Sequence, residues 1–237
     1  MNRIENDTLI SLNPATGEEV GRLPITAPEK IPAVVATARS AQPGWAQLSL
    51  EQRADQLRPF GKALVQAADE LGTLLTREMG KPLAEGIGEA KHCGSSLDKT
   101  LDEMIEALTP EPIDDENVCS TLVFDPLGVC AGITPWNFPL SMPHWTVIPA
   151  LMAGNSVILK PSEKTPLVAQ AYADLLMKHL PEGVLQVIHG DGTQGQALVA
   201  ADVDLIAFTG SRATGAHILE RAGGGLKRVI LELGGKD

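Results

Sequence analysis

Aromatic residues and positive charge are both scarce in this chain. Phe, Trp and Tyr make up only 3% of its 237 residues, so we expect a core of aliphatic side chains. Acidic residues outnumber Lys and Arg by 30 to 19, which leaves a formal net charge of -11. Nucleic-acid binding requires a surplus of Lys and Arg on one face. The charge balance therefore argues against a nucleic-acid partner.

Long apolar runs and paired cysteines are also missing. No stretch approaches the roughly 18 consecutive apolar residues of a membrane-spanning helix, and residues 1–10 contain neither the basic nor the apolar segment of an export signal. The three cysteines, Cys93, Cys119 and Cys130, are odd in number and share no metal-binding spacing. This argues against a disulfide framework and a metal site. We expect a cytoplasmic protein with no membrane partner.

After residue 125 the chain alternates between strand and helix signals. Apolar runs at 128–134 and 156–159 resemble buried strands, and the apolar segment 140–153 between them is long enough for a helix. The alternation continues through predicted helices at 166–179, 193–201 and 213–222, and predicted strands at 185–189, 205–208 and 228–232. Five strands and four connecting helices predict an α/β fold with a Rossmann-like, doubly wound, mostly parallel five-stranded sheet.

The first 108 residues predict a helical region that begins with a small hairpin. A turn at 13–17 separates two short strand signals, and Ser49 with Gln52 matches a capping box at the start of a helix. We expect Pro43 to end the preceding helix and Pro59 to kink or split the following one. The predicted helices span 28–42, 49–67, 69–79 and 83–108.

Residues 109–125 interrupt the helical region. The segment starts with a stretch rich in Pro and acidic residues and continues into a β-branched run at 118–124. That run has no partner in the predicted sheet. We therefore predict a β-hairpin that projects from the rest of the molecule.

Four polar residues follow the first two strands of the sheet. Asn137 comes after the first strand, and Lys160, Ser162 and Glu163 come at the end of the second. Ligands of open parallel sheets bind outside the carboxyl ends of the strands. The sequence therefore predicts a ligand site at this edge.

Two strand-to-helix turns are candidates for binding a phosphate group. The first contains Gly190, Gly192 and Gly195, the spacing of a dinucleotide-binding fingerprint, but the expected acidic residue about 20 positions later is absent. The second is 208–211, followed by Thr214, where small residues leave a helix N-terminus open to an anion. From the residues alone, the two turns are equal alternatives.

Four motifs together resemble the aldehyde dehydrogenase superfamily. They are PWNFP at 135–139, LKPSE at 159–163, FTGS at 208–211 and LELGG at 231–235, and EMGKP at 78–82 adds a fifth similarity. The resemblance covers essentially the whole chain but only about the first half of a typical family member. It is close to the branch of the succinate-semialdehyde and betaine-aldehyde dehydrogenases.

The resemblance implies an NAD(P)-dependent oxidation of an aldehyde to a carboxylic acid through a cysteine thioester. Asn137 matches the residue that donates a hydrogen bond to the developing oxyanion. Glu232 matches the general base that activates water against the thioester. The small-molecule partner is therefore an aldehyde, whose identity the sequence does not specify.

The resemblance also implies an NAD site. Lys160 and Glu163 match the residues that hold the adenosine ribose, and the acidic Glu163 favours NAD, with NADP possible. Ser211 and its helix match the pyrophosphate site, so this turn is preferred over the glycine turn, while Trp136 is either beside the nicotinamide or an ordinary core aromatic. The cofactor-binding residues are predicted to be Thr134, Pro135, Trp136, Lys160, Ser162, Glu163, Gly192, Gly195, Phe208, Thr209, Gly210, Ser211, Thr214, Glu232, Leu233 and Gly234.

The nucleophilic cysteine of the family has no counterpart in this sequence. We expect residues 1–108 and 126–237 to form the NAD-binding domain, 109–125 to form an oligomerisation hairpin, and the catalytic domain to be absent. The chain is then a cofactor-binding fragment, inactive alone, of an enzyme that forms a homo-oligomer, either a dimer or a tetramer. The alternative is a non-catalytic nucleotide-binding or interaction subunit that oligomerises with a full-length relative. An unrelated Rossmann-like oxidoreductase is disfavoured, because the only tyrosine, Tyr172, lies on a predicted helix.

Overall fold

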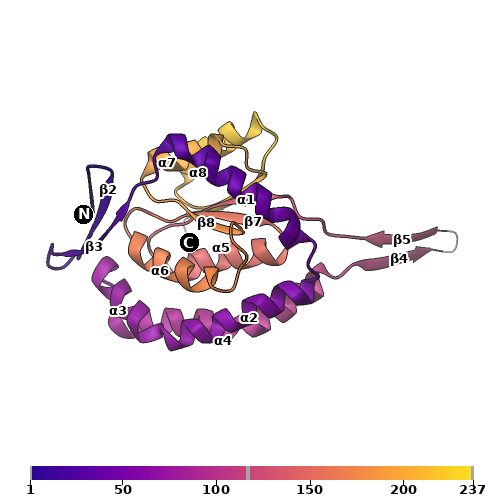
Figure 1. Ribbon diagram of the computed structural model, residues 1–237, viewed down its shortest axis with the longest axis horizontal. Coiled ribbons are helices and arrows are strands. Elements are labelled where there is room, and N and C mark those ends of the chain that lie inside the picture. The colour runs from indigo at the N-terminus through magenta and orange to yellow at the C-terminus, as the bar shows by residue number, and fades with distance from the viewer. Residues whose placement is uncertain (1, 116–117, 236–237) are drawn as a thin grey trace.

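The central element of the structure is a five-stranded parallel sheet (Figure 1). The computed structural model describes residues 2–115 and 118–235. The strand order is β10-β9-β6-β7-β8, and every neighbouring pair is parallel, as the alternating sequence pattern predicted. The strands are β6 (Val129–Ile133), β7 (Ser156–Lys160), β8 (Leu185–Val187), β9 (Leu205–Gly210) and β10 (Arg228–Leu233).

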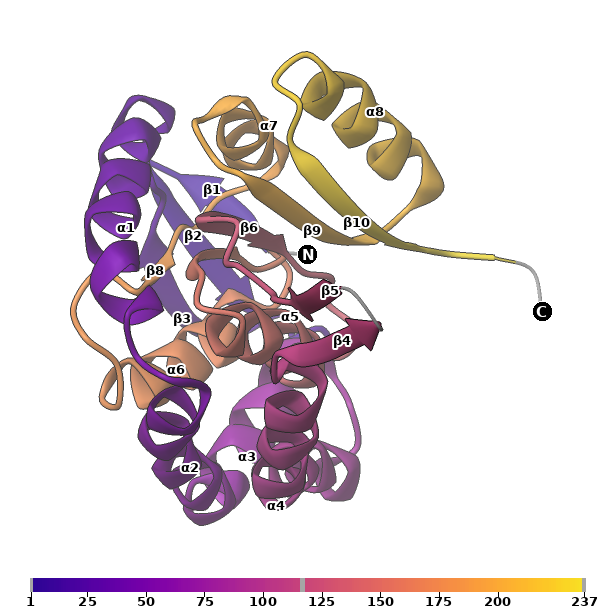
Figure 2. The ribbon, with the colours of Figure 1, turned by 90° about the vertical axis from the view of Figure 1, so that its right-hand side faces the viewer.

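Helices cover both faces of the sheet, because its strands carry apolar side chains on both sides. Along β7, Ile158 packs in one cluster, whereas Val157 and Leu159 pack in the other. The Ile158 side is covered by α1 (Ile31–Ala46), α7 (Gly192–Ala200) and α8 (Arg212–Gly223). The opposite side is covered by α5 (Ser141–Met152) and α6 (Pro166–Met177), as Figure 2 shows.

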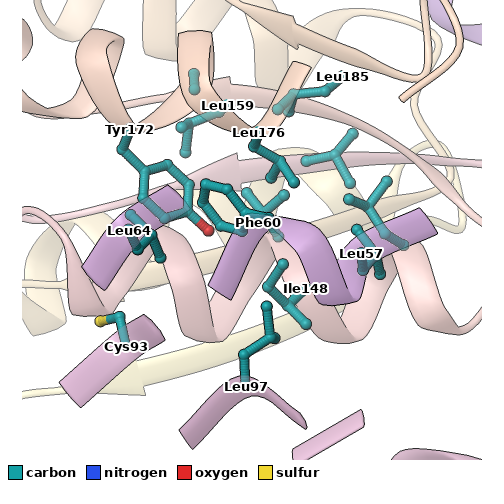
Figure 3. Packing of buried hydrophobic residues seen from close by; sticks show 14 of the residues in the cluster. Leu57, Phe60, Leu64, Cys93, Leu97, Ile148, Leu159, Tyr172, Leu176 and Leu185 are labelled. Atoms are coloured by element: carbon teal, nitrogen blue, oxygen red, sulfur yellow. The ribbon is translucent and has the colours of Figure 1, made fainter. Parts of the chain in front are cut away.

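A second helical layer lies outside α5 and α6 (Figure 1). Figure 3 shows how Phe60 and Leu64 point from this layer towards Tyr172 of α6. The rings of Phe60 and Tyr172 meet edge to face, with their centroids 5.2 Å apart, and such aromatic pairs add to the stabilisation from burial. The layer consists of α2 (Leu50–Gln66), α3 (Ala68–Met79) and α4 (Leu83–Leu108).

Neither proline divides its helix as the sequence predicted. The expectation that Pro43 ends the first helix is wrong, because α1 continues to Ala46. Trp45 is buried beyond the proline, and its Nε1 donates to the carbonyl of Leu151, which keeps the last turn in place. Pro59 is exposed inside an unbroken α2, and buried residues on both sides of it hold the helix against the core. The predicted capping box at Ser49 and Gln52 is confirmed.

Two smaller sheets complete the fold. The predicted N-terminal hairpin is present as β2 (Thr8–Leu12) and β3 (Glu19–Pro24), but a further strand, β1 (Arg3–Glu5), joins it. The pattern of β1 was not recognised, because all three residues are exposed and show no apolar alternation. A short 3-10 helix, Pro28–Lys30, leads into α1.

The predicted hairpin projects from the end of the α4 layer (Figure 1). It pairs β4 (Glu111–Asp115) with β5 (Val118–Leu122) in antiparallel register. Residues 116 and 117 lie outside the described residues. Within the described ranges, no helix has both the length and the hydropathy to cross a membrane, and no group of acidic, His and Cys side chains is arranged to hold a metal ion.

Candidate functional site

A crevice opens at the carboxyl ends of β6 and β9. These strands are neighbours in the sheet, but the chain continues from β6 to β7 on one side and from β9 to β10 on the other. The helices that follow them, α5 and α8, cover opposite faces. The two loops therefore diverge towards opposite faces of the sheet, and open α/β sheets bind ligands in the crevice between such loops.

Ten of the sixteen predicted cofactor residues line one cavity of about 700 Å³ at this crevice. Both candidate phosphate-binding turns contribute to it, so the structure brings together what the sequence offered as alternatives. The ten residues are Thr134, Pro135, Lys160, Ser162, Glu163, Gly192, Gly195, Phe208, Thr209 and Thr214.

The two helix N-termini at this cavity differ in charge. Asp191 caps α7: its carboxylate accepts from the backbone N–H of Thr193 at 2.8 Å, a hydrogen bond that lowers the pKa of Asp191. Ser211 caps α8 with a neutral hydroxyl, which accepts from the N–H of Thr214 at 3.2 Å. An anion is attracted to a free helix N-terminus but repelled by a carboxylate. The α8 end is therefore the better anion site.

Lys160 ends β7 as a buried cation beside the cavity. Its Nζ donates to the carbonyl of Pro161 at 3.0 Å and lies 3.9 Å from the carboxylate of Glu163. Burial lowers the pKa of Lys160, and the negative charges of Glu163 and Asp191 partly offset that effect. An ammonium group has three donors, so Lys160 can donate to a ligand while keeping its bond to Pro161.

Thr134 presents a buried hydroxyl at the same cavity. Its side chain is almost fully buried, and among the described residues its Oγ1 has no hydrogen-bond partner. A buried polar group without a partner costs free energy. This hydroxyl therefore suits a polar ligand group.

Six predicted residues lie outside this cavity. Glu232 instead lines a second cavity of about 670 Å³ on the opposite face of the sheet, together with Met142 and Trp145 of α5. Phe208 and Thr209 line both cavities and therefore separate them. The other five residues are not among those that line the first cavity: Trp136, Gly210, Ser211, Leu233 and Gly234.

Asn137 and Trp136 are exposed in the loop between β6 and α5. Trp136 lines a third cavity with Glu163 and Lys164, and the Lys164 ammonium lies 5.0 Å from the centre of its ring. The interpretation of Trp136 as a core aromatic is therefore wrong, since it is not buried.

Several residues at the first cavity were missed from the sequence. Thr214, His217 and Arg221 lie three and four positions apart on α8 and all line the cavity. Arg221 Nε donates to His217 Nε2 at 3.2 Å. The helical spacing from the predicted Thr214 could have identified both residues. Asp191 and Gln196 of the neighbouring turn and helix were missed as well.

Comparison with known proteins identifies the family. The sequence profile described as "Aldehyde dehydrogenase family" matches residues 3–237. This chain belongs to the aldehyde dehydrogenase family. It is 37% identical to mitochondrial succinate-semialdehyde dehydrogenase of Arabidopsis thaliana, over 98% of this chain and 44% of the relative. It is 38% identical to betaine aldehyde dehydrogenase of Rhizobium etli, over 95% of this chain and 47% of the relative.

Solved structures of other proteins have the same fold. The complex of PnpE with nicotinamide adenine dinucleotide matches with a TM-score of 0.91 and 34% identity, over 97% of this chain and 48% of that one. The NADP complex of glyceraldehyde-3-phosphate dehydrogenase from Bacillus halodurans matches with a TM-score of 0.92 and 30% identity, over 98% and 50%. The chain thus spans about half the length of these relatives. The predicted family, its Rossmann-like fold and the half-length match are confirmed.

Proposed function

We propose that this chain is the NAD-binding part of an aldehyde dehydrogenase that oxidises an aldehyde to a carboxylic acid. The observation that carries the proposal is the gathering of ten predicted cofactor residues, from two loops, two strands and two helices, around one cavity. NADP is the weaker alternative. Bound there, the nicotinamide cofactor would accept a hydride from the substrate.

Lys160 and Glu163 would hold the adenosine ribose. The free donors of Lys160 and the acceptor oxygens of Glu163 suit a pair of ribose hydroxyls. A 2'-phosphate would meet the Glu163 carboxylate and be repelled, which favours NAD. Thr134 and the N-terminus of α8 supply a further hydroxyl and an anion site for the same ligand.

Asn137 and Glu232 would serve the aldehyde. The side-chain amide of Asn137 is exposed and can donate to an oxygen that becomes negative. Glu232 lies beyond Phe208 and Thr209, in the second cavity, where an ordered water would be within reach of its carboxylate. Glu232 would therefore act outside the cofactor cavity, and Asn137 would act from the exposed loop between β6 and α5.

None of the three cysteines suits the role of nucleophile. Burial raises the pKa of Cys93 to about 11 and that of Cys130 to about 12. Cys119 is exposed on the projecting hairpin. A thiolate is required for attack on an aldehyde. We infer that these 237 residues bind cofactor but do not oxidise an aldehyde by themselves.

The proposal also assigns a role to each segment of the chain. Residues 1–108 and 126–237 act as the NAD-binding domain, and 109–125 as the oligomerisation hairpin of a cytoplasmic homo-oligomer. The hairpin exposes the apolar side chains of Ile113, Val118 and Leu122, which supports its role in oligomerisation. If the hairpin instead pairs with a full-length relative, the chain acts as a binding subunit.

Calorimetric titration of the chain with NAD and NADP tests the proposal. We expect saturable NAD binding, tighter than NADP binding, and a loss of about tenfold in NAD affinity in Glu163→Gln, because a charge-assisted hydrogen bond becomes a weaker neutral one. NADP binding should weaken less or improve. Glu182→Gln, an exposed glutamate, is the matched control. A folded chain without NAD binding would refute the proposal.

A further inference from the structure

Helices α5 and α6 begin directly after the two loops of the proposed site, yet neither has a cap from its own N-terminal residue. The loop 134–140 leads into α5, whose N-cap is Leu140, and the loop 161–165 leads into α6, whose N-cap is Thr165. Neither N-cap side chain accepts a hydrogen bond from its helix. The first backbone N–H groups of a helix need acceptors from elsewhere, and both ends are buried here.

Glu89 of α4 supplies the acceptor for α5. Its Oε1 accepts from the N–H of Leu140 at 3.0 Å and from that of Ser141 at 2.9 Å. Its Oε2 pairs with Lys81 Nζ at 2.6 Å, and both side chains are buried. Lys81 in turn lies over the ring of Phe138, 3.9 Å from its centre. The buried pair therefore holds the loop that carries Asn137 at two points.

Glu78 of α3 does the same for α6. Its two carboxylate oxygens accept from the N–H groups of Leu167 and Val168, each at 2.9 Å. Ser11 of β2 donates to the same carboxylate at 2.8 Å. The start of α6 is thereby tied to α3 and the N-terminal sheet.

The loop before α6 has a further anchor in Asn2. Its side-chain amide donates to the carbonyls of Glu163, at 2.9 Å, and Lys164, at 3.1 Å. The loop 161–165 is thus held at its middle by Asn2 and at its end by Glu78.

We propose that Glu89 and Glu78 are positioning residues, through which the outer helical layer holds the loops 134–140 and 161–165 in their binding geometry. The inference rests on the proposed function, because those loops carry the residues assigned to oxyanion and ribose. A carboxylate at a helix N-terminus also gains from the helix dipole. Small displacements of binding groups are costly, so loss of either cap should weaken binding at its own loop.

For Glu89, two double variants separate the cap from the buried ion pair. Lys81→Met with Glu89→Leu removes both charges and the cap, whereas Lys81→Met with Glu89→Gln removes both charges and keeps one acceptor oxygen. Exchanging a buried ion pair for apolar residues is often tolerated. The two proteins differ in the acceptor for Leu140 and Ser141 and in the amide NH2 group that Gln adds.

Binding of NAD and AMP, with hydrogen exchange of the loop amides, gives the readout for Glu89. We expect the Leu variant to lose exchange protection at Leu140 and Ser141 and to bind NAD about tenfold more weakly than the Gln variant. AMP lacks the nicotinamide half, so its affinity should not differ between them. Equal protection and equal NAD affinity would overturn the role of Glu89. So would unfolding of the Leu variant alone, which would make Glu89 a residue of folding rather than of positioning.

For Glu78, we expect AMP binding to weaken together with NAD binding. Glu78→Leu should weaken AMP and NAD about equally, by about tenfold, since both contain the adenosine ribose. Glu78→Gln keeps one acceptor oxygen, so its affinities for AMP and NAD should fall between those of Glu78→Leu and those of the unaltered chain. The control Glu70→Gln changes an exposed glutamate and should bind both ligands as the unaltered chain does. AMP affinity unchanged in both Glu78 variants would overturn this half of the proposal.

Failure of the proposed function is distinguishable in the same series. If the unaltered chain binds neither NAD nor AMP, the cofactor assignment is wrong. Hydrogen exchange then decides the positioning roles by itself. Selective loss of exchange protection at residues 140–141 or 167–168 supports them, and unchanged protection overturns them.

Discussion

Glu78 is a carboxylate in a buried position, and its surroundings act on it in opposite directions. Burial raises the pKa of Glu78 to about 7, while hydrogen bonds from Val168, Leu167 and Ser11 lower it without cancelling that effect. Between the ordinary value of 4.5 and about 7, the folded chain therefore keeps a proton that the unfolded chain releases. The contribution of Glu78 to stability is fully present below pH 4.5 and is lost as the pH rises through 7.

The pH dependence of unfolding should reveal this residue. A difference of about 2.5 pKa units corresponds to about 3 kcal/mol. Between pH 5 and 8, the free energy of unfolding of the unaltered chain should therefore fall by up to this amount relative to that of Glu78→Gln. Urea unfolding at several pH values measures it, with Glu70→Gln as the baseline. Parallel pH profiles for the two proteins would contradict the prediction.

Thr134 offers a second test at the residue scale, because its buried hydroxyl has no partner among the described residues. Thr134→Val should raise the free energy of unfolding by about 1 kcal/mol, since it removes an unsatisfied polar group, and should weaken NAD binding. Ser156→Ala is the matched control: its hydroxyl is also buried and without a partner in the described part of the chain, but it lies at the start of β7, away from the cavity. Calorimetry and urea unfolding of both variants are required. Equal NAD affinity in Thr134→Val and the unaltered chain would exclude a cofactor contact.

At the scale of elements, the packing of the glycines in α4 explains why this segment forms a long helix. The sequence predicted a helix over 83–108 despite three glycines, and α4 has these bounds. A Cβ on Gly94 would lie 2.5 Å from the carbonyl oxygen of Gly61 in α2, and a Cβ on Gly86 would lie 2.9 Å from that of Gly72 in α3. Gly86 and Gly94 therefore allow close contact between helices, and packing offsets their low helix propensity.

Two alanine substitutions in α4 should act in opposite directions. Gly94→Ala should lower the free energy of unfolding by about 1–3 kcal/mol, because the added methyl group meets backbone of α2. Gly88→Ala should raise it by about 1 kcal/mol, because the site is open and alanine is the better helix former. Urea unfolding compares the two. A stabilising Gly94→Ala would show that the helices separate at no cost.

At the scale of the whole molecule, one side of the sheet is incompletely covered. The second cavity lies against β9 and β10, and Trp145 and Ile230 at its edge are both more than half exposed. Strand β10 is also an edge of the sheet. Exposed apolar surface and an open edge strand both favour association.

The isolated chain should therefore self-associate through this side. Trp145→Gln combined with Ile230→Lys should lower the weight-average mass in light scattering at a given concentration, without lowering the melting temperature. Val118→Lys on the hairpin is the comparison, because it changes a separate group of exposed apolar residues. A larger effect from Val118→Lys would place the association at the hairpin instead.

The sequence by itself determined the order of the elements and the residues gathered at the strand ends. Strands such as β7 and helices such as α4 have local signals, since apolar periodicity and length depend on nearby residues alone. The motifs also predicted the family, and ten of the predicted cofactor residues line one cavity. The capping box at Ser49 was equally readable, because all its partners lie within four residues.

Only the tertiary structure decided which distant groups meet. It placed the turns at Gly192 and Thr209 at one cavity, because strand pairing joins segments that are far apart in the sequence. It kept helix α1 intact at Pro43, since the burial of Trp45 outweighs the lost backbone hydrogen bond. It also made Glu78 and Glu89 caps of α6 and α5, each at least 50 residues away. No local pattern encodes such contacts, because their free energy arises only after the layers have packed together.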